Sequence, residues 1–196
     1  ARAVLGKDPY GKYPKRDGVL AVVGYKESHL GGVVYPYLCK AGAFKIIRDL
    51  ETGLWRVFRP WVPQDEARRK EAKPAPPLIP PRMIKKIVWK DRGKNVFSSI
   101  YLKTGWEIKA FSSRSKPDQG YSADLIHIDE DVLDPRHYEE AAGRLIDRSG
   151  RLIWSALPHD DNDVIARFSE RAETQKDEHE RGGPKPFSVV YRISME

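Results

Sequence analysis

The acidic run at residues 129–131 is the part of the sequence best suited to chemistry. Residues 125–128 are three aliphatic side chains and a histidine, which predicts a buried strand, and Asp129, Glu130 and Asp131 follow directly. In a parallel sheet, the carboxyl end of a strand is where open α/β folds bind their ligands. Crowded carboxylates repel each other unless a cation or solvent relieves them. In a nucleotide-hydrolysing fold, one such acid helps to hold Mg²⁺ and the next positions the attacking water. The alternative is a strand that runs into a solvated acidic turn.

A second short strand is expected about twenty residues later. Residues 151–155 are mainly apolar and end in Ser155, and Pro158 follows shortly afterwards. As a parallel neighbour of the acidic strand, this segment would bring Ser155 close to Asp129 and Glu130. A hydroxyl there can form a hydrogen bond to a terminal phosphate or to the nucleophilic water. An ordinary core strand that ends in serine is the alternative.

The elements that must position these residues follow from the apolar pattern. Residues 18–24 form an apolar run between two glycines, which predicts a strand buried on both faces. The last third of the chain is expected to alternate, with strands at 123–129, 151–155 and 187–193 and helices at 135–148 and 161–176. Such an alternation implies right-handed crossovers in a mainly parallel sheet. We therefore expect an α/β fold with helices on both faces of the sheet.

The middle of the chain is expected to be less regular. A helical stretch is predicted around residues 29–40, interrupted by glycines and a proline. Turn residues at 51–53 and 103–105 separate strand-like segments and predict two β-hairpins, at 44–58 and 96–112. Residues 60–82 contain seven of the fifteen prolines and predict a surface insertion or linker that is partly extended.

The overall composition narrows the class of protein. A chain of 196 residues with 40% apolar residues fits one domain with a core, and its formal charge of +7 favours a polyanionic partner, nucleic acid first. The single cysteine, Cys39, excludes an internal disulfide framework and a cysteine-based zinc site. No apolar run approaches the roughly 20 residues of a membrane span. These features point to a protein of a reducing, intracellular compartment.

Residues 6–13 imitate the phosphate-binding loop Gly-x4-Gly-Lys-[Ser/Thr]. Gly6, Gly11 and Lys12 fit, but no strand precedes them, a proline and charged residues follow in place of a helix, and Tyr13 cannot supply the short hydroxyl that binds magnesium. We therefore expect this segment not to bind phosphate. Residues 1–5 are expected to be the last turn of a helix, closed by Gly6. A true phosphate loop would then lie upstream of Ala1, and the chain would be a fragment.

The order of these elements resembles the ATPase domain of terminase large subunits, the DNA-packaging enzymes of tailed viruses. Residues 104–112 resemble the family's polar turn that leads into a strand ending in serine. Residues 119–130 are similar to its Gly-x-x-x-Asp lead into the Walker B strand. Residues 155–158 match the place of its Ser/Thr-x-x-Pro coupling motif, and residues 18–24 look like its second strand. These motifs are short, but their order covers nearly the whole chain.

The resemblance implies a P-loop NTPase fold of the ASCE or RecA-like type with an inserted β-hairpin. It implies that Asp129 is the Walker B acid that binds Mg²⁺, that Glu130 is the catalytic carboxylate, and that Ser155 couples ATP hydrolysis to movement. Asp129 and Ser155 would contact the nucleotide, and Arg114 would contact DNA or a phosphate. Arg144 or Arg148, which cluster with Arg151, would act in trans as an arginine finger. Solvated helix charges are the alternative for these arginines.

The parent protein would use ATP and Mg²⁺ to drive double-stranded DNA into a viral capsid. Its expected partners are DNA, the small terminase subunit and the portal protein, in a ring of identical subunits. It would act in the cytoplasm of the bacterial host, at the procapsid portal, with no membrane partner. The Walker A loop and the terminase nuclease domain are absent from the sequence, so we expect residues 1–196 alone to hydrolyse little or no ATP.

Two other functions remain open at this point. A metal-dependent nuclease could use residues 129–131 together with Asp160, Asp161 and Asp163. Against it, adjacent carboxylates on one strand point to alternate faces. A non-enzymatic nucleic-acid-binding module could use the basic surface and exposed aromatics such as Trp61 and Trp89. The histidines at 29, 127 and 159 match no metal-ligand spacing, and packing within a strand is the simpler explanation for His127.

Overall fold

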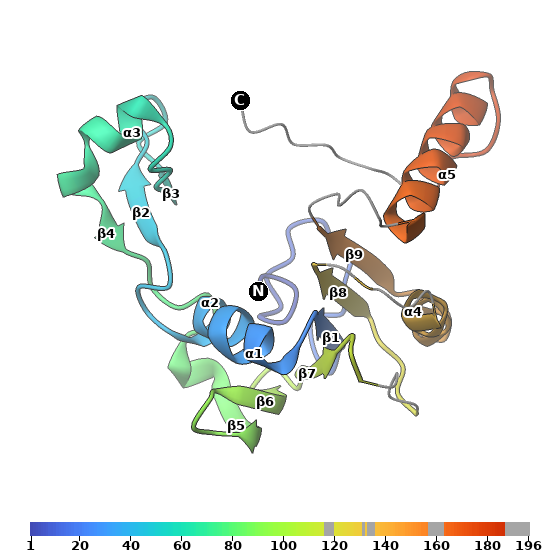
Figure 1. Ribbon diagram of the computed structural model, residues 1–196, viewed down its shortest axis with the longest axis horizontal. Coiled ribbons are helices and arrows are strands. Elements are labelled where there is room, and N and C mark those ends of the chain that lie inside the picture. The colour runs from blue at the N-terminus through green and yellow to red at the C-terminus, as the bar shows by residue number, and fades with distance from the viewer. Residues whose placement is uncertain (116–119, 131, 133–135, 157–162, 187–196) are drawn as a thin grey trace.

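A six-stranded sheet organises the protein, in the strand order β5-β6-β7-β1-β8-β9 (Figure 1). The computed structural model describes residues 1–115, 120–130, 132, 136–156 and 163–186. The strands of this sheet are β1 (Val19–Gly24), β5 (Ile84–Asp91), β6 (Val96–Leu102), β7 (Glu107–Ser112), β8 (Leu125–Asp129) and β9 (Arg151–Ser155). The strand predicted at 187–193 lies outside the described residues.

The sheet is mixed but mostly parallel. β1 pairs in parallel with β7 and β8, and β8 pairs in parallel with β9. Only β6 runs the other way, antiparallel to β5 and β7. β1 therefore lies between two parallel neighbours, and five of its six residues are buried. The prediction of a buried central strand at residues 18–24 is confirmed, and so are the strands that carry Asp129 and Ser155.

A single helical segment follows β1. It consists of α1 (Glu27–His29), a π-helical turn η1 (Leu30–Val34) and α2 (Tyr35–Cys39), close to the predicted helix at 29–40. The π-helical turn contains Gly31, where an added Cβ would lie 2.1 Å from the carbonyl oxygen of Lys94. Glycine therefore allows the helix to approach the turn between β5 and β6, and the widened turn falls where the helix meets that backbone.

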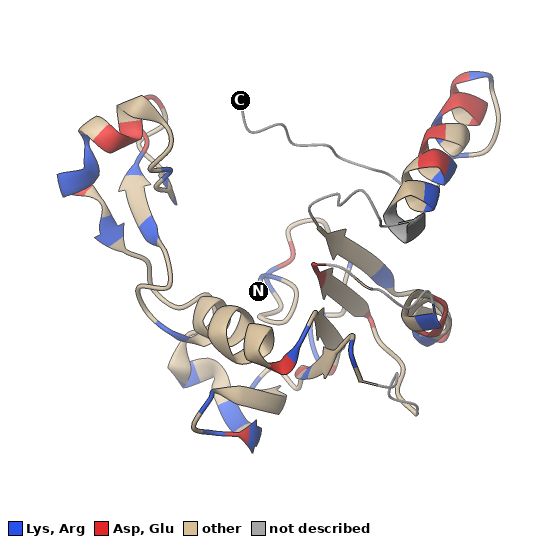
Figure 2. Ribbon diagram, in the orientation of Figure 1, with Lys and Arg blue, Asp and Glu red and all other residues tan. Residues whose placement is uncertain are grey.

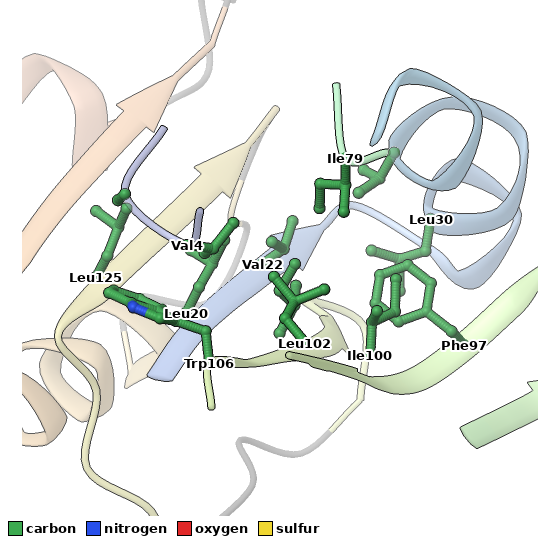
Figure 3. Close-up of a cluster of buried hydrophobic side chains, with 13 residues drawn as sticks. Val4, Leu20, Val22, Leu30, Ile79, Phe97, Ile100, Leu102, Trp106 and Leu125 are labelled. Carbon is green, nitrogen blue, oxygen red and sulfur yellow. The ribbon is translucent and has the colours of Figure 1, made fainter. Parts of the chain in front are cut away.

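Helices cover both faces of the sheet. β1 sends alternate side chains to opposite sides, so it contributes to a core on each face. Leu20 and Val22 join a core with the helical segment 27–39 and strands β6 and β7 (Figure 3). Ala21 and Val23 join a second core with α4 (Arg136–Ile146). The last helix, α5 (Asp163–Glu180), packs through Phe168, whose ring lies edge-on to Tyr138 of α4 and Trp154 of β9.

The first residues have the geometry of a helix end, as predicted. The N–H of Lys7 donates to the carbonyl of Arg2, and the N–H of Gly6 donates to that of Ala3, with Gly6 at φ 66°. This is the Schellman pattern that closes helices. In the loop that follows, the carboxylate of Asp8 accepts hydrogen bonds from the backbone N–H groups of Tyr10 and Lys12. The segment thus uses its own carboxylate where a phosphate loop would present free N–H groups.

Both predicted hairpins form, but they differ in role. β2 (Lys45–Arg48) and β3 (Trp55–Val57) lie outside the main sheet and fit the expected inserted hairpin. The second hairpin, β6 and β7, is no insertion, because β7 is the direct parallel partner of β1. Strand β5 was not predicted. It is an edge strand whose lysines, such as Lys85 and Lys86, are exposed. Such charges protect an open edge from pairing with another chain. They also weaken the apolar pattern by which a strand is predicted from sequence.

Residues 40–80 form a small subdomain that stands away from the main sheet (Figure 1). The proline-rich segment, predicted as a surface insertion or linker, is an insertion with its own secondary structure. It contains α3 (Pro63–Ala67), η2 (Arg69–Glu71) and β4 (Lys73–Pro74), and β4 pairs with β2 to give a sheet of order β3-β2-β4. A last 3-10 turn, η3 (Pro81–Met83), leads into β5. Ile79 is fully buried in the main core, where it anchors the subdomain.

None of the helices in the described part of the chain combines the length and the apolar character that crossing a bilayer requires.

Candidate active site

The carboxyl ends of three parallel strands meet at one edge of the sheet. Gly24 ends β1, Asp129 ends β8 and Ser155 ends β9, and the register pairs Gly24 with Asp129 and Asp129 with Ser155. The Oγ of Ser155 lies 2.8 Å from Oδ1 of Asp129 and donates a hydrogen bond to it. The expectation that Asp129 and Ser155 lie side by side is therefore confirmed.

Glu130 joins the same site through an unusual backbone conformation. Its φ is 72°, in the left-handed region that side chains other than glycine rarely occupy. Two hydrogen bonds hold it there: its N–H donates to the carbonyl of Ser155 at 2.8 Å, and its carbonyl accepts from the indole N–H of Trp154 at 2.9 Å. A residue held in this region stores strain of about 1–3 kcal/mol, which the surrounding structure must offset.

This turn explains how two neighbouring carboxylates can serve one site. Adjacent carboxylates of a regular strand point to opposite faces, which is why only part of the run at residues 129–131 was expected to converge. The strand ends at Asp129, and the left-handed turn redirects Glu130. Both carboxylates now face the ring of His29 in α1, with Asp129 Oδ2 2.9 Å from Nε2 and Glu130 Oε1 3.6 Å from Nδ1.

His29 is a site residue that the sequence did not reveal. Its side chain is only 9% exposed, whereas that of Asp129 is 28% and that of Glu130 57% exposed. The absence of a side chain at Gly24 makes room for it, since a Cβ there would lie 3.0 Å from Cδ2 of His29. His29 and Asp129 are 100 positions apart in the sequence, so no local pattern connects them. The imidazole of His29 holds Oδ2 of Asp129, whereas the more exposed side chain of Glu130 remains accessible to solvent.

His127 completes a line of hydrogen bonds across the edge. It lies two residues before Asp129 on β8, hence on the same face, and its Nε2 is 2.9 Å from the Oγ of Ser155. Burial lowers the pKa of His127, although the nearby Asp129 carboxylate raises it. A neutral imidazole follows at neutral pH. Because Ser155 donates its proton to Asp129, His127 must donate from Nε2 to Ser155. Its two-residue spacing from Asp129 was the available sequence signal.

The fit of this site to magnesium can be judged from its donors. Within the described residues, no group of three or more His, Cys, Asp or Glu side chains is arranged to hold a metal ion. Mg²⁺ needs few protein ligands when it keeps its waters and binds substrate phosphates. Asp129 has both oxygens fixed by neighbours and remains partly exposed, so it suits contact through a water shell. Asp131, Asp160 and Asp161 lie outside the described residues, and only the backbone of Asp163 is described.

The arginines expected to contact DNA or a phosphate lie in different parts of the protein. Arg114 follows β7 at the same edge as Asp129, and its guanidinium stacks 4.5 Å from the ring centroid of Tyr25. Arg148 lies at the other end of the sheet, where it pairs with the buried Asp124 at 3.0 Å. Arg144 pairs with Glu140 and lines a cavity of about 540 Å³ on the α4 side. Arg151 lies over Tyr13. A role in DNA contact or in trans stays a prediction for these residues.

The site gathers two carboxylates, a serine hydroxyl and two imidazoles at the carboxyl edge of the mostly parallel sheet of an α/β protein, the edge at which open α/β folds bind their ligands. Neither the family models nor the curated proteins with which the chain was compared give a match. The functional assignment therefore depends on this geometry and on the motifs.

We expect His29→Ala to weaken the dependence on magnesium of any activity at this site. The variant removes the hydrogen bond that fixes Oδ2 of Asp129, and loss of such a supporting partner typically costs 10–100-fold in metal affinity or activity. The measurement is the Mg²⁺ concentration that gives half-maximal ATP hydrolysis in a form of the protein that includes a phosphate-binding loop. His179→Ala, in α5, serves as the control. An unchanged magnesium requirement in His29→Ala would show that this histidine only fills space.

Proposed function

We propose that this chain is part of the ATPase motor of a terminase large subunit, which drives viral double-stranded DNA into a capsid. The observation that carries the proposal is the pairing of Asp129 with Ser155 at the carboxyl edge of two neighbouring parallel strands, with Glu130 turned toward the same side. It supports a fold of the P-loop NTPase type, in which an acid pair and a small hydroxyl face the terminal phosphate.

Each residue has a role in this proposal. Asp129 would hold Mg²⁺ through its water shell, and the ion would neutralise charge on the phosphates of ATP. Glu130 would accept a proton from the attacking water. Ser155 lies between Asp129 and His127, so a change at the phosphate would reach β9 and the segment after it through hydrogen bonds. This connection supports a coupling role for Ser155.

The sheet order supports a position for the phosphate loop in this proposal. β8 already has β1 on one side and β9 on the other. A loop that faces Asp129 and Ser155 would come from a strand added beside β9, whose outer edge has no partner among the described residues. We assign that strand to a part of the protein upstream of Ala1. Residues 6–13 are a poor substitute, because Asp8 occupies their backbone donors.

The proposed partners follow from the motor role. Double-stranded DNA fits the net charge of +7. The small terminase subunit, the portal protein and further copies of the chain in a ring would complete the machine, at the procapsid in the cytoplasm of a bacterial host. One of Arg144 and Arg148 would reach a neighbouring subunit's nucleotide, and Arg114, at the site's own edge, would contact DNA or a phosphate.

The test is ATP hydrolysis by a longer form of the protein that includes a Gly-rich Lys-Ser/Thr loop. We expect Mg²⁺-dependent turnover that is lost in Asp129→Ala, and little or no turnover by residues 1–196 alone. Turnover by the short chain that disappears in Lys12→Ala would overturn the assignment of the phosphate loop. Cleavage of DNA without any nucleotide, lost in the same Asp129→Ala variant, would instead identify a metal-dependent nuclease.

A further inference from the structure

The small sheet of the subdomain has one covered face and one open face. Directly paired residues of β2, β3 and β4 share a face, so Arg48 and Trp55 lie together, as do Ile46, Val57 and Lys73. Residues on the other face include Ile47, which is fully buried, and Arg56. The two faces of this sheet therefore differ in chemistry as well as in exposure.

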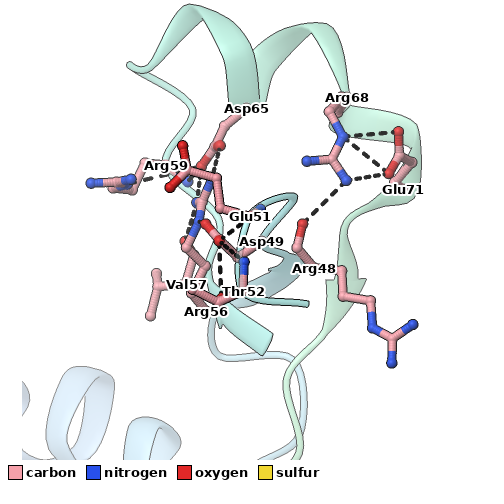
Figure 4. Close-up of polar contacts among 10 residues, drawn as sticks. All are labelled: Arg48, Asp49, Glu51, Thr52, Arg56, Val57, Arg59, Asp65, Arg68 and Glu71. Atoms are coloured by element: carbon pink, nitrogen blue, oxygen red, sulfur yellow. Dashed lines mark hydrogen bonds and ion pairs between the residues drawn. The ribbon is translucent and has the colours of Figure 1, made fainter. Parts of the chain in front are cut away.

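The covered face is held by buried charges (Figure 4). Asp65 of α3 is 1% exposed and accepts two hydrogen bonds of 2.6 Å from the guanidinium of Arg56. Arg56 also donates to Asp49 at 2.9 Å. The side-chain hydrogen bonds from Arg56 keep the pKa of Asp65 well below its usual range. This network fixes α3 beneath the sheet, so the opposite face is presented on a rigid support.

The open face carries an aromatic ring with two cations close to it. The indole of Trp55 is half exposed, at 49%, with the Arg48 guanidinium 6.0 Å and the Lys73 ammonium 5.7 Å from its ring. Val57, beside it on the same strand, is 51% exposed. Figure 4 shows the Arg48 side chain pointing away from the buried network. An aromatic face with flanking cations is suited to a ligand that combines flat rings with negative charge.

The subdomain also carries more than half of the chain's net positive charge. Residues 40–80 hold nine Lys and Arg against five Asp and Glu, which is +4 of the chain's +7 (Figure 2). Four of the five acids are paired with arginines of the subdomain itself, namely Asp49, Asp65, Glu66 and Glu71. Within the described residues, neither Arg48 nor Lys73 has an acidic partner. The cations of the open face are thus left for an external anion.

We infer that the open face of the β3-β2-β4 sheet binds single-stranded nucleic acid. Trp55 stacks with an unpaired base, and Arg48 and Lys73 contact the phosphates on either side of it. A duplex keeps its bases stacked inside and would engage only the charges. A protein partner or a second copy of the chain would need to bring acidic groups to both cations, whereas a nucleic acid strand supplies rings and phosphates at regular intervals. This surface does not depend on nucleotide hydrolysis at Asp129.

The experiment measures binding of a fluorescent oligothymidine of about 12 nucleotides to the chain of residues 1–196 by anisotropy. We expect Trp55→Ala to weaken binding roughly 5–100-fold, since stacking of one base is lost, and Trp55→Phe to retain most of it. Arg48→Gln and Lys73→Gln should each lower the slope of log affinity against log salt by about 0.7. Tyr10→Ala and Lys103→Ala, exposed positions outside the subdomain, are the matched controls and should bind normally.

Three results would overturn the inference. The first is unchanged affinity of Trp55→Ala for the oligothymidine. The second is equal affinity for a duplex of the same length, because stacking would then contribute nothing. The third is self-association of the chain that is lost in Trp55→Ala, with no nucleic acid bound, which would make this face a contact between copies. Thermal unfolding of Trp55→Ala, expected to be unchanged for an exposed side chain, checks the fold, and no outcome depends on ATP.

Discussion

Glu130→Gln is expected to reduce the rate of ATP hydrolysis on the order of 10²–10⁴-fold in a form of the protein that includes a phosphate-binding loop. The amide has the shape of the carboxylate but cannot accept a proton from water. The side chain is 57% exposed and its nearest ionisable neighbour is the ring of His29 at 3.6 Å, so the substitution should leave the fold and the binding of Mg²⁺ and ATP largely intact.

The measurement combines single-turnover hydrolysis with a separate nucleotide-binding assay. Glu139→Gln, on the exposed side of α4, is the control for a general loss of acid. Retained turnover in Glu130→Gln would remove this residue from the chemistry, and loss of nucleotide binding would show that it acts on the ligand and not on water. Either result would count against the proposed motor site.

Trp106→Ala is expected to cause the largest loss of stability among single substitutions in the main sheet. Trp106 is fully buried beneath β1, and its indole N–H donates to the carbonyl of Pro14 at 3.2 Å. Its ring packs where Gly18 has no side chain, since a Cβ at Gly18 would lie 2.5 Å from it. Removal of such a ring leaves a cavity and typically costs about 3–5 kcal/mol, a large part of the roughly 5–15 kcal/mol that stabilises a domain.

The measurement is thermal and denaturant unfolding of residues 1–196. A loss of this size lowers the melting temperature by roughly 6–20 °C in a chain of this length. Trp61→Ala is the matched control, because Trp61 is 64% exposed and should cost little. A loss below about 1 kcal/mol for Trp106→Ala would mean that the loop at residues 6–17 does not pack against the sheet.

Trp61 and Trp89 also show how far aromatic residues can be interpreted from sequence. Both had been considered as exposed rings for nucleic acid. Trp61 is exposed, but Trp89 packs edge-on against Tyr35, 5.1 Å between ring centroids, beside the main core. The half-exposed ring that has two cations close to it is Trp55, on the predicted hairpin. The alternation along a strand shows which residues share a face. Which of the two faces remains exposed depends on how other segments pack against the sheet.

Locally encoded elements were predicted well. β1, β8 and β9 are short apolar runs with clear ends. The tendency of such a run to be buried depends mainly on its own residues. β5 was missed because its apolar residues alternate with lysines at a sheet edge. For the proline-rich segment the sequence left an insertion and a linker as alternatives, since prolines remove backbone donors. Asp65, which is buried, and Arg56, nine residues away, organise it through an ion pair that no periodicity reports.

The apolar runs of the chain are enough to locate the ends of the strands, and therefore to put Asp129 and Ser155 at strand termini. Packing between distant segments makes these termini neighbours in register, brings Glu130 to the same side through a left-handed turn, and places His29 against both carboxylates. The difference lies in the distance along the chain over which residues interact. Burial of one segment depends on its own residues. The register of strands, the direction of a side chain at a turn and contacts between residues a hundred positions apart depend on how separate segments pack together.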